Sequence, residues 1–186
     1  MKITGISGSP NIGGNNERII DLALGMAEEK GFETGKIFIS QLEVSPCTDC
    51  GACRNGRECS IDDDMAGIYE TLETSDAFIV SSPVFFGCVS AQLKALFDRS
   101  VLLRRNGFLL KGKVGGAVAI GGSRNGGQEF TIHAIHSWMH IHGMVVVGDM
   151  AHFGGIAVKP VESDEDGLKT VKDTVEMVCG TLSRFK

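Results

Sequence analysis

Short apolar segments of strand length alternate with amphipathic segments of helix length along this chain of 186 residues. The segment 114–120 is almost entirely apolar, as expected for a strand buried on both faces. This alternation predicts an α/β fold in which an open parallel sheet carries helices on both faces. The predicted strands are residues 2–6, 33–39, 77–82, 114–120 and 144–147. The predicted helices are residues 16–30, 63–74, 90–102, 128–142 and 164–184.

The loop after the first strand distinguishes between two sheet orders. It lacks the Gly-x-Gly-x-x-Gly pattern of dinucleotide-binding folds, and the chain offers five strands rather than six. These features favour a flavodoxin-like five-stranded parallel sheet with the order 2-1-3-4-5. No Pro/Ser-rich linker divides the sequence, so we expect a single domain over residues 1–186, with a cysteine-rich loop inserted at 45–62 after the second strand.

Charge and hydropathy argue against several classes of partner. The formal net charge is −5, the pI is near 5.5 and no run of basic residues is present, so nucleic acid and anionic membranes are poor candidates. No signal peptide is recognisable, and no apolar run approaches the ~20 residues that span a bilayer. A cytoplasmic location is therefore expected. Six cysteines in a reducing compartment indicate metal or redox chemistry rather than structural disulfides.

Four of these cysteines lie within thirteen residues, in the pattern Cys47-x2-Cys50-x2-Cys53-x5-Cys59. Two-residue spacers let a tight loop present successive thiolates to adjacent irons, and the longer spacer lets the chain turn back with the fourth, so the pattern predicts one [4Fe–4S] cluster. A structural zinc site usually takes two close cysteine pairs that are well separated in sequence, which fits this pattern less well. Zinc, disulfides formed in air and unloaded thiols are the alternatives.

The loop that follows the first predicted strand, residues 5–16, has a composition suited to a phosphate. In sheets of this type, ligands bind at the carboxyl ends of the strands. The loop leads directly into a helix N-terminus, where hydroxyls, side-chain amides and free backbone N–H groups can donate to an anion. It contains no lysine or arginine before residue 18, which favours the single phosphate of FMN over a nucleoside triphosphate. The alternative is an ordinary polar loop between a strand and a helix.

Two further loops have compositions suited to a flat ring. Residues 81–90 place Phe85 and Phe86 at the end of a strand, where they suit contact with a flavin; alternatively they plug the core or an interface. Residues 121–129 contain four glycines, which let the backbone approach a ring system closely. The alternative for this third loop is a flexible surface segment.

Motifs in these loops resemble those of NAD(P)H-dependent FMN reductases and of tryptophan-repressor-binding-protein-like quinone oxidoreductases. They are Ser7-Gly-Ser-Pro10, Ser82-Pro-Val-Phe-Phe-Gly87 with Gln92-Leu-Lys-Ala-Leu-Phe-Asp-Arg99, Gly126-Gly-Gln-Glu129 and His142-Gly-Met144. The resemblance implies that the FMN phosphate is held by Ser7, Ser9, Asn11, Gly14, Asn15 and Asn16, of which Asn16 replaces the usual threonine. It implies that the isoalloxazine ring is lined by Pro83, Val84, Phe85, Phe86, Gly87, Gly121, Gly122, Ser123, Arg124, Gly126 and Gly127. It also places His142 beside the ring of a neighbouring subunit.

The cysteine run within such a chain resembles the iron–sulfur flavoprotein family, as does the sequence Asp62-Asp63-Asp64-Met65 that follows it. This second resemblance implies a [4Fe–4S] cluster beside FMN and assembly as a homodimer or homotetramer. It also implies electron exchange with ferredoxin or a similar donor, and a small acceptor such as a quinone, O2 or peroxide. No catalytic side chain is predicted, because electron transfer itself needs no general acid or base.

Other candidate residues are interpreted as structural. The three aspartates cap a helix rather than bind a metal, and capping by Asp62 or Ser60 is expected. The helical histidines His133, His136 and His140 form a packed or interface face rather than a zinc site. The two cysteines outside the run are interpreted as small buried residues, Cys88 and Cys179.

Two functional alternatives stay open at this point. One is an NAD(P)H-dependent FMN or quinone reductase without a functional cluster. The other is a non-catalytic electron carrier or redox-sensing protein. The sequence does not separate an electron carrier from an oxidoreductase.

Overall fold

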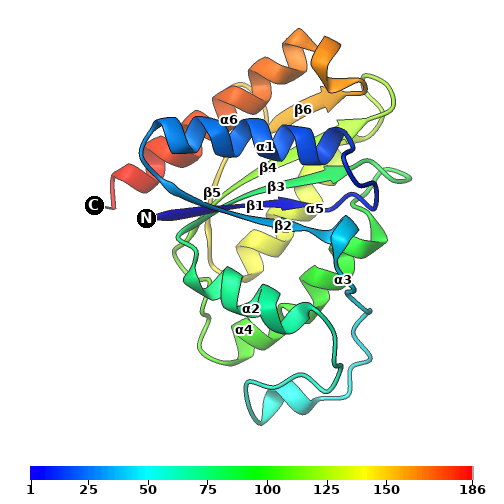
Figure 1. Ribbon diagram of the computed structural model, residues 1–186, viewed down its shortest axis with the longest axis vertical. Coiled ribbons are helices and arrows are strands. Elements are labelled where there is room, and N and C mark those ends of the chain that lie inside the picture. Colours follow the sequence, from blue (N-terminus) through cyan, green and yellow to red (C-terminus); the bar gives the residue numbers. More distant parts are fainter. Residues whose placement is uncertain (186) are drawn as a thin grey trace.

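The computed structural model describes residues 1–185 and contains one parallel sheet with the strand order β2-β1-β3-β4-β5, while β6 also pairs with β4 (Figure 1). The parallel sheet and its order confirm the sequence prediction. The strands are β1 (Lys2–Ser7), β2 (Glu33–Phe38), β3 (Ala77–Pro83), β4 (Val114–Gly121), β5 (Val145–Val147) and β6 (Gly155–Val158). The α-helices are α1 (Asn15–Glu29), α2 (Met65–Thr74), α3 (Ala91–Arg99), α4 (Val101–Arg105), α5 (Gln128–Ile141) and α6 (Glu165–Ser183). The short 3-10 helices are η1 (Ile39–Gln41), η2 (Ala52–Arg54) and η3 (Val161–Ser163).

The predicted strand 144–147 corresponds to β5, and a further short strand, β6, also pairs with β4. In β5, Val145 pairs with Val114 at the start of β4, and in β6, Gly155 pairs with Val118 further along the same strand. Residues 148–154 leave the sheet between them. A Cβ atom at Gly154 would lie 2.3 Å from the carbonyl oxygen of Ala117, so only glycine allows the chain to return this close to β4. The sequence pattern predicted β5 and missed β6, because four residues beside a glycine-rich excursion carry little periodicity.

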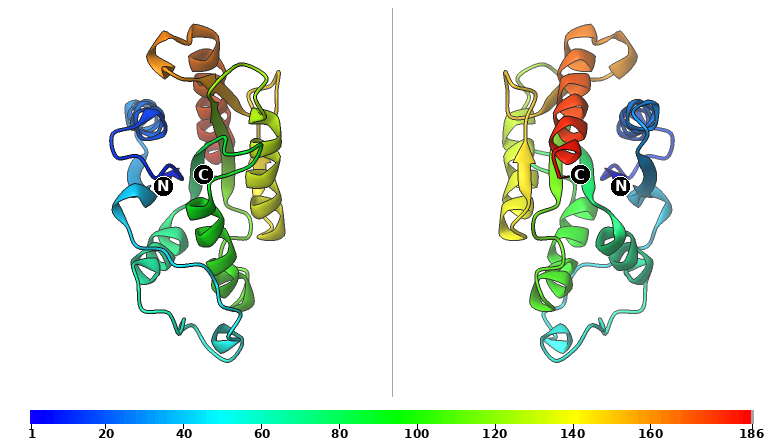
Figure 2. Two further views of the ribbon diagram at one scale, coloured as in Figure 1. Left: turned by 90° about the vertical axis from the view of Figure 1, so that its right-hand side faces the viewer. Right: turned by 90° about the vertical axis from the view of Figure 1, so that its left-hand side faces the viewer.

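Two helical layers cover the sheet (Figure 2). Helices α1 and α6 pack on one face, against inward side chains such as Ile3, Ile79 and Val118. Helices α2, α3, α4 and α5 pack on the other face, against Ile6 and Phe78 among others. Every residue of β4 is buried, as its apolar sequence predicted. No helix in the described part of the chain is long and apolar enough to cross a membrane.

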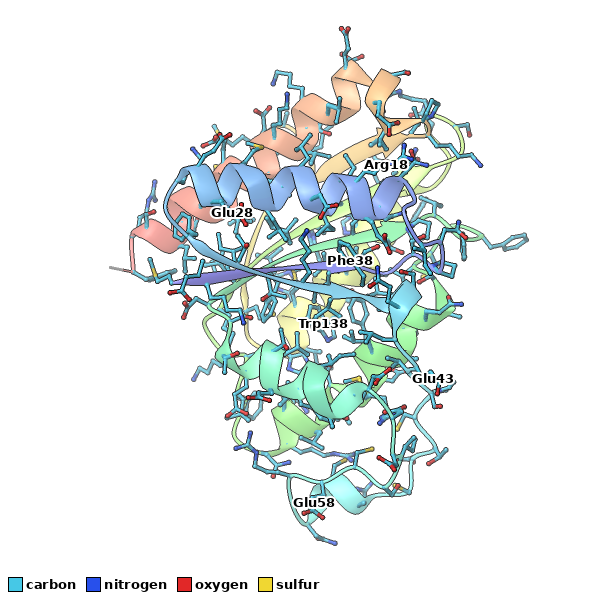
Figure 3. All side chains as sticks on the ribbon, viewed as in Figure 1. Arg18, Glu28, Phe38, Glu43, Glu58 and Trp138 are labelled. Carbon is cyan, nitrogen blue, oxygen red and sulfur yellow. The ribbon has the colours of Figure 1, made fainter. Side chains whose placement is uncertain are left out.

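The helix predicted over residues 90–102 is divided at Ser100 into α3 and α4. The Ser100 hydroxyl is buried, accepts a hydrogen bond from the Trp138 indole at 2.8 Å and is hydrogen-bonded to the His142 ring at 2.9 Å. Trp138 lies between the sheet and the helices below it (Figure 3) and stacks on Phe97 with ring centroids 4.5 Å apart. The break between α3 and α4 therefore coincides with a polar contact between Ser100 and residues at the end of α5. The periodicity of a single helix does not reveal such a contact.

Candidate functional site

Three loops meet at the carboxyl ends of β1, β3 and β4, on the right of Figure 1. We call them the phosphate loop (residues 8–14), the aromatic loop (84–89) and the glycine loop (122–127). The backbone N–H of Gly8 donates to Ser81 at 2.7 Å, and that of Val84 donates to Ile120 at 2.9 Å. A Cβ atom on Gly127 would lie 3.1 Å from Cα of Gly87, so the glycine and aromatic loops are also in contact. The structure thus brings together the three segments that the sequence singled out.

The phosphate loop offers donors to an anion. Helix α1 begins at Asn15 after Gly14, and no side chain caps its first turn, so the N–H groups there are available to a ligand. The Ser7 hydroxyl at the end of β1 is fully buried and has no hydrogen-bond partner in the described structure. A buried hydroxyl is rarely left unpaired. These two features fit a bound phosphate.

Three of the predicted phosphate contacts have structural partners as well. The side-chain oxygen of Asn16 accepts from Ser81 at 2.6 Å, and that of Asn15 accepts from the backbone of Val161 at 3.0 Å. Ser9 accepts from the backbone N–H of Asn11 at 3.1 Å, which shapes the loop. Within residues 1–185 the amide nitrogens of the two helical asparagines make no hydrogen bond and can donate to a ligand, so their predicted role stays a prediction.

The aromatic loop points its rings outward. Phe86 is fully exposed and has a positive φ of 52°, while Phe85 is 46% exposed and pairs with Cys88 in a short antiparallel bridge. The alternative that these two rings plug the core of this chain is therefore wrong. Cys88 is exposed, which corrects its interpretation as a small buried residue. It lies in the predicted loop, in a tight turn that Phe85 and Cys88 close with backbone hydrogen bonds.

The glycine loop is held in shape by one side chain. Gln128, buried at the start of α5, accepts from Gly126 N–H at 2.8 Å and donates to the Ser123 carbonyl at 2.7 Å. Arg124 forms an ion pair with Asp164, the residue that caps α6. Burial raises the pKa of Asp164, but the N–H of Val158 and the Arg124 guanidinium outweigh it and hold that pKa below its usual range.

All four cysteines of the run line one cavity of 560 Å³ between the cysteine loop (residues 45–62) and helices α3, α4 and α5. Phe97 and Trp138 form part of its apolar wall. Cys88 and Val89 of the aromatic loop line it too, so the cavity reaches from the cysteines to a loop predicted to hold the flavin. Glu58 marks the cysteine loop at the bottom of Figure 3.

The four sulfurs are not gathered into a cage. Within residues 1–185, no group of three or more His, Cys, Asp or Glu side chains lies close enough to hold a metal ion. All six cysteines are free thiols, so the structure contains none of the disulfides considered above. Three sulfurs already have polar partners: Cys47 accepts from Asp49 N–H at 3.4 Å, Cys50 lies 3.0 Å from the Ser60 hydroxyl, and Cys53 accepts from a side-chain N–H of Arg105 at 2.9 Å. Four thiols around one cavity fit a four-thiolate group in number and chemistry.

Comparisons with known proteins place this arrangement in a family. The model of the NADPH-dependent FMN reductase family matches residues 1–157. An iron–sulfur flavoprotein from Methanosarcina thermophila is 60% identical over 182 residues, which cover 98% of this chain and 95% of that protein. The chain belongs to the iron–sulfur flavoprotein family. A second iron–sulfur flavoprotein, from Methanocaldococcus jannaschii, is 45% identical and covers 100% of both chains.

The fold agrees with this assignment. The solved structure of a flavodoxin, WrbA-like protein from Agrobacterium tumefaciens superimposes with a TM-score of 0.73 over 100% of this chain and 99% of that one. At 19% identity this similarity concerns the fold alone. Membership in the FMN reductase and iron–sulfur flavoprotein families makes this chain an FMN flavoprotein oxidoreductase.

In this iron–sulfur flavoprotein, His142 lines the cysteine cavity and lies far from the glycine loop of its own chain. It follows the last turn of α5, while the glycine loop precedes the first, about 20 Å away along the 14-residue helix. Its ring is buried, and burial together with Arg104 lowers its pKa to about 4. The predicted approach to a flavin in a neighbouring subunit is not tested by a single chain and stays a prediction.

Two functional neighbours escaped the sequence analysis. Buried Glu17 accepts from Gly13 N–H at 2.7 Å, so a carboxylate holds the tip of the phosphate loop. Buried Arg99 joins the two ends of the cysteine loop: its Nη1 donates to the Ser45 carbonyl at 2.9 Å and to Asp63 at 2.8 Å. Arg99 is the last residue of a motif in which the sequence analysis gave it no role. Its burial identifies it as a structural anchor, and burial of an arginine could not be read from the sequence.

The aspartate run closes the neck of the same loop. Asp63, rather than Asp62 or Ser60, accepts from Met65 N–H at 3.1 Å at the start of α2 and also from Ser45 N–H at 3.0 Å. Asp64 accepts from Glu43 N–H at 2.7 Å. The N-cap residue of α2 is Asp64, whose side chain makes no capping bond, so the prediction that Asp62 or Ser60 caps this helix is wrong. Asp63 binds the first N–H of the helix instead, because its contact with Arg99 fixes its orientation.

Proposed function

We propose that this protein carries electrons from a one-electron donor such as ferredoxin to a small acceptor, for which a quinone, O2 and peroxide are the candidates. Its resident cofactors are FMN and one [4Fe–4S] cluster. Residues 1–186 form one domain whose loop 45–62 holds the cluster. The observation that supports this proposal is the single cavity lined by all four cysteines of the run and by Cys88 of the aromatic loop.

The two cofactors supply the electron chemistry, since a flavin exchanges one or two electrons and a cubane cluster exchanges one. The protein binds and separates them. Cys47, Cys50, Cys53 and Cys59 are the cluster ligands. The Ser7 hydroxyl and the first turn of α1 bind the phosphate, and the aromatic and glycine loops bind the ring. Two subunits or four assemble so that His142 approaches the ring of a neighbour.

The apolar wall of the cavity has a physical consequence. Phe97 and Trp138 are packed in the core, so water is excluded along the part of the wall that they form, whereas Cys47 and Cys50 are exposed to solvent. Electrostatic interactions next to the dry part of the wall are stronger than in open water. Electron transfer between the cluster and the flavin needs no proton relay, so no residue is assigned as a general acid or base.

A second candidate is an NAD(P)H-dependent FMN or quinone reductase without a functional cluster. The open arrangement of the four sulfurs in the described residues favours it, as does the match to the NADPH-dependent FMN reductase family. In that case the cysteine loop is only a structural appendage of the flavin site.

One experiment separates the two candidates. The protein is purified and reconstituted under anaerobic conditions, and iron, labile sulfide and FMN are assayed. We expect about four irons and four sulfides with one FMN per chain. Cys59→Ser is expected to lose the iron and Cys179→Ser, a buried cysteine on α6, to keep it. A flavin spectrum without iron or sulfide, and steady NAD(P)H oxidation by Cys59→Ser at the wild-type rate, contradicts the proposal and supports the second candidate.

A further inference from the structure

One arginine of the helical layer reaches a sulfur of the cysteine loop. Arg105 is the last residue of α4, and its Nη1 donates to Sγ of Cys53 at 2.9 Å. Cys53 lies in η2, the 3-10 turn of the cysteine loop, and α4 packs beside η2. The contact therefore joins the scaffold to one of the four proposed ligands.

The next residue holds the loop in place independently. The Asn106 amide donates to the carbonyls of Leu102 at 2.9 Å, Gly56 at 3.1 Å and Cys53 at 3.4 Å. The bonds to Cys53 and Gly56 hold the loop backbone within η2 and just after it. The guanidinium of Arg105 is thus not required to anchor the backbone, and its own contact is with the sulfur.

In the described part of the chain, Arg105 has no carboxylate partner. No ion pair involves Arg105 among residues 1–185, whereas the neighbouring Arg104 donates to the Ile141 carbonyl at 3.0 Å and lies over the Phe108 ring. Arg57, on the cysteine loop itself, is paired with Glu73. The positive charge of Arg105 is therefore directed at the sulfur and not neutralised by an acidic side chain.

We propose that Arg105 is a positioning residue that raises the reduction potential of the cluster through Cys53. This inference rests on the proposed function, because it requires the cluster. Reduction adds one electron and makes the cluster more negative. A positive charge and an N–H donor at a ligand sulfur stabilise that more negative state more than the oxidised one. The contact also fixes the direction from which Cys53 presents its sulfur.

The test is a redox titration of the anaerobically loaded protein, followed by electron paramagnetic resonance of the reduced cluster. Arg105→Gln and Arg105→Met are expected to shift the midpoint potential of the cluster to more negative values, with the larger shift in Arg105→Met because it also removes the donor. Arg57→Gln removes one positive charge from the cysteine loop itself without touching a sulfur, and the potential of that variant is expected to stay near that of the wild type.

Iron and sulfide assays accompany each titration. They distinguish failure of the proposed function from failure of the role proposed for Arg105. A wild-type protein that holds no cluster defeats the proposed function itself. A loaded Arg105→Met with the wild-type potential, or with the same shift as Arg57→Gln, overturns the role of Arg105 while leaving the proposed function intact. Arg105→Gln and Arg105→Met could both lose iron while Arg57→Gln stays fully loaded. That result also overturns the proposed effect on the reduction potential and makes Arg105 a purely structural residue.

Discussion

Arg99 and Asp63 form a buried bidentate ion pair, with Nη1 2.8 Å from Oδ2 and Nη2 3.0 Å from Oδ1. Their side chains are 1% and 4% exposed. The pair lies where the cysteine loop leaves and rejoins the helical layer, since Arg99 also binds the Ser45 carbonyl. The loop is therefore closed at its neck by a contact between the last residue of α3 and Asp63, which lies two residues before α2.

Removing one partner of this pair should cost much stability. Asp63→Asn leaves the Arg99 guanidinium buried without a counter-charge, and we expect the free energy of unfolding to fall by about 3–5 kcal/mol. Urea denaturation followed by circular dichroism measures it. The exposed neighbour is the control: Asp62→Asn should change stability by no more than about 0.5 kcal/mol. Equal effects of the two substitutions would show that the ion pair does not close the loop.

Asp164 should make the stability depend on pH. Its pKa is lowered in the folded protein, so the stabilisation is fully present above the unfolded value of about 4 and is lost as the pH falls through the folded value. We expect Asp164→Asn to be less stable than the wild type at pH 6, and the difference to shrink towards pH 3. Urea unfolding at both pH values tests this. A difference that is constant with pH contradicts the depressed pKa.

The unpaired hydroxyl of Ser7 should matter for FMN and not for folding. Ser7→Ala removes no hydrogen bond within the described protein, so the unfolding midpoint should be unchanged. Loss of a bond to a charged phosphate costs about 1.5–3 kcal/mol, so the dissociation constant for FMN should rise roughly 10- to 150-fold. Quenching of FMN fluorescence by apoprotein measures it. Ser137→Ala, on the exposed face of α5, serves as control; wild-type affinity in Ser7→Ala would refute the phosphate contact.

Phe86 should contribute to ring binding. It is fully exposed, so Phe86→Ala should leave the free energy of unfolding nearly unchanged. An aromatic contact with the isoalloxazine is worth about 0.5–1.5 kcal/mol, and its loss should weaken FMN binding by roughly 2- to 12-fold. Phe130→Ala, at another exposed phenylalanine, is the matched control. If both variants bind FMN as the wild type does, the aromatic loop does not hold the ring.

Several features could be predicted from the sequence because they depend on local order along the chain. The alternation of apolar strands and amphipathic helices determined the parallel sheet, and the positive φ of 82° at Gly31 ends α1 where the sequence predicted. The three polar or aromatic loops follow β1, β3 and β4, and parallel strands necessarily bring such loops to one edge. The spacing of the four cysteines likewise placed them on one short loop.

Only the tertiary structure decided which distant side chains meet. Arg99 reaches Asp63 across 36 residues, Arg105 reaches Cys53 across 52, and His142 joins the cysteine cavity through Ser100, 42 residues earlier. Cys88 is exposed within the predicted loop, and the sequence did not show which side chains of that loop face solvent. Periodicity reports which face of an element is buried, whereas these contacts depend on how helices of one layer pack against each other, and their partners therefore appear only once the layer is assembled.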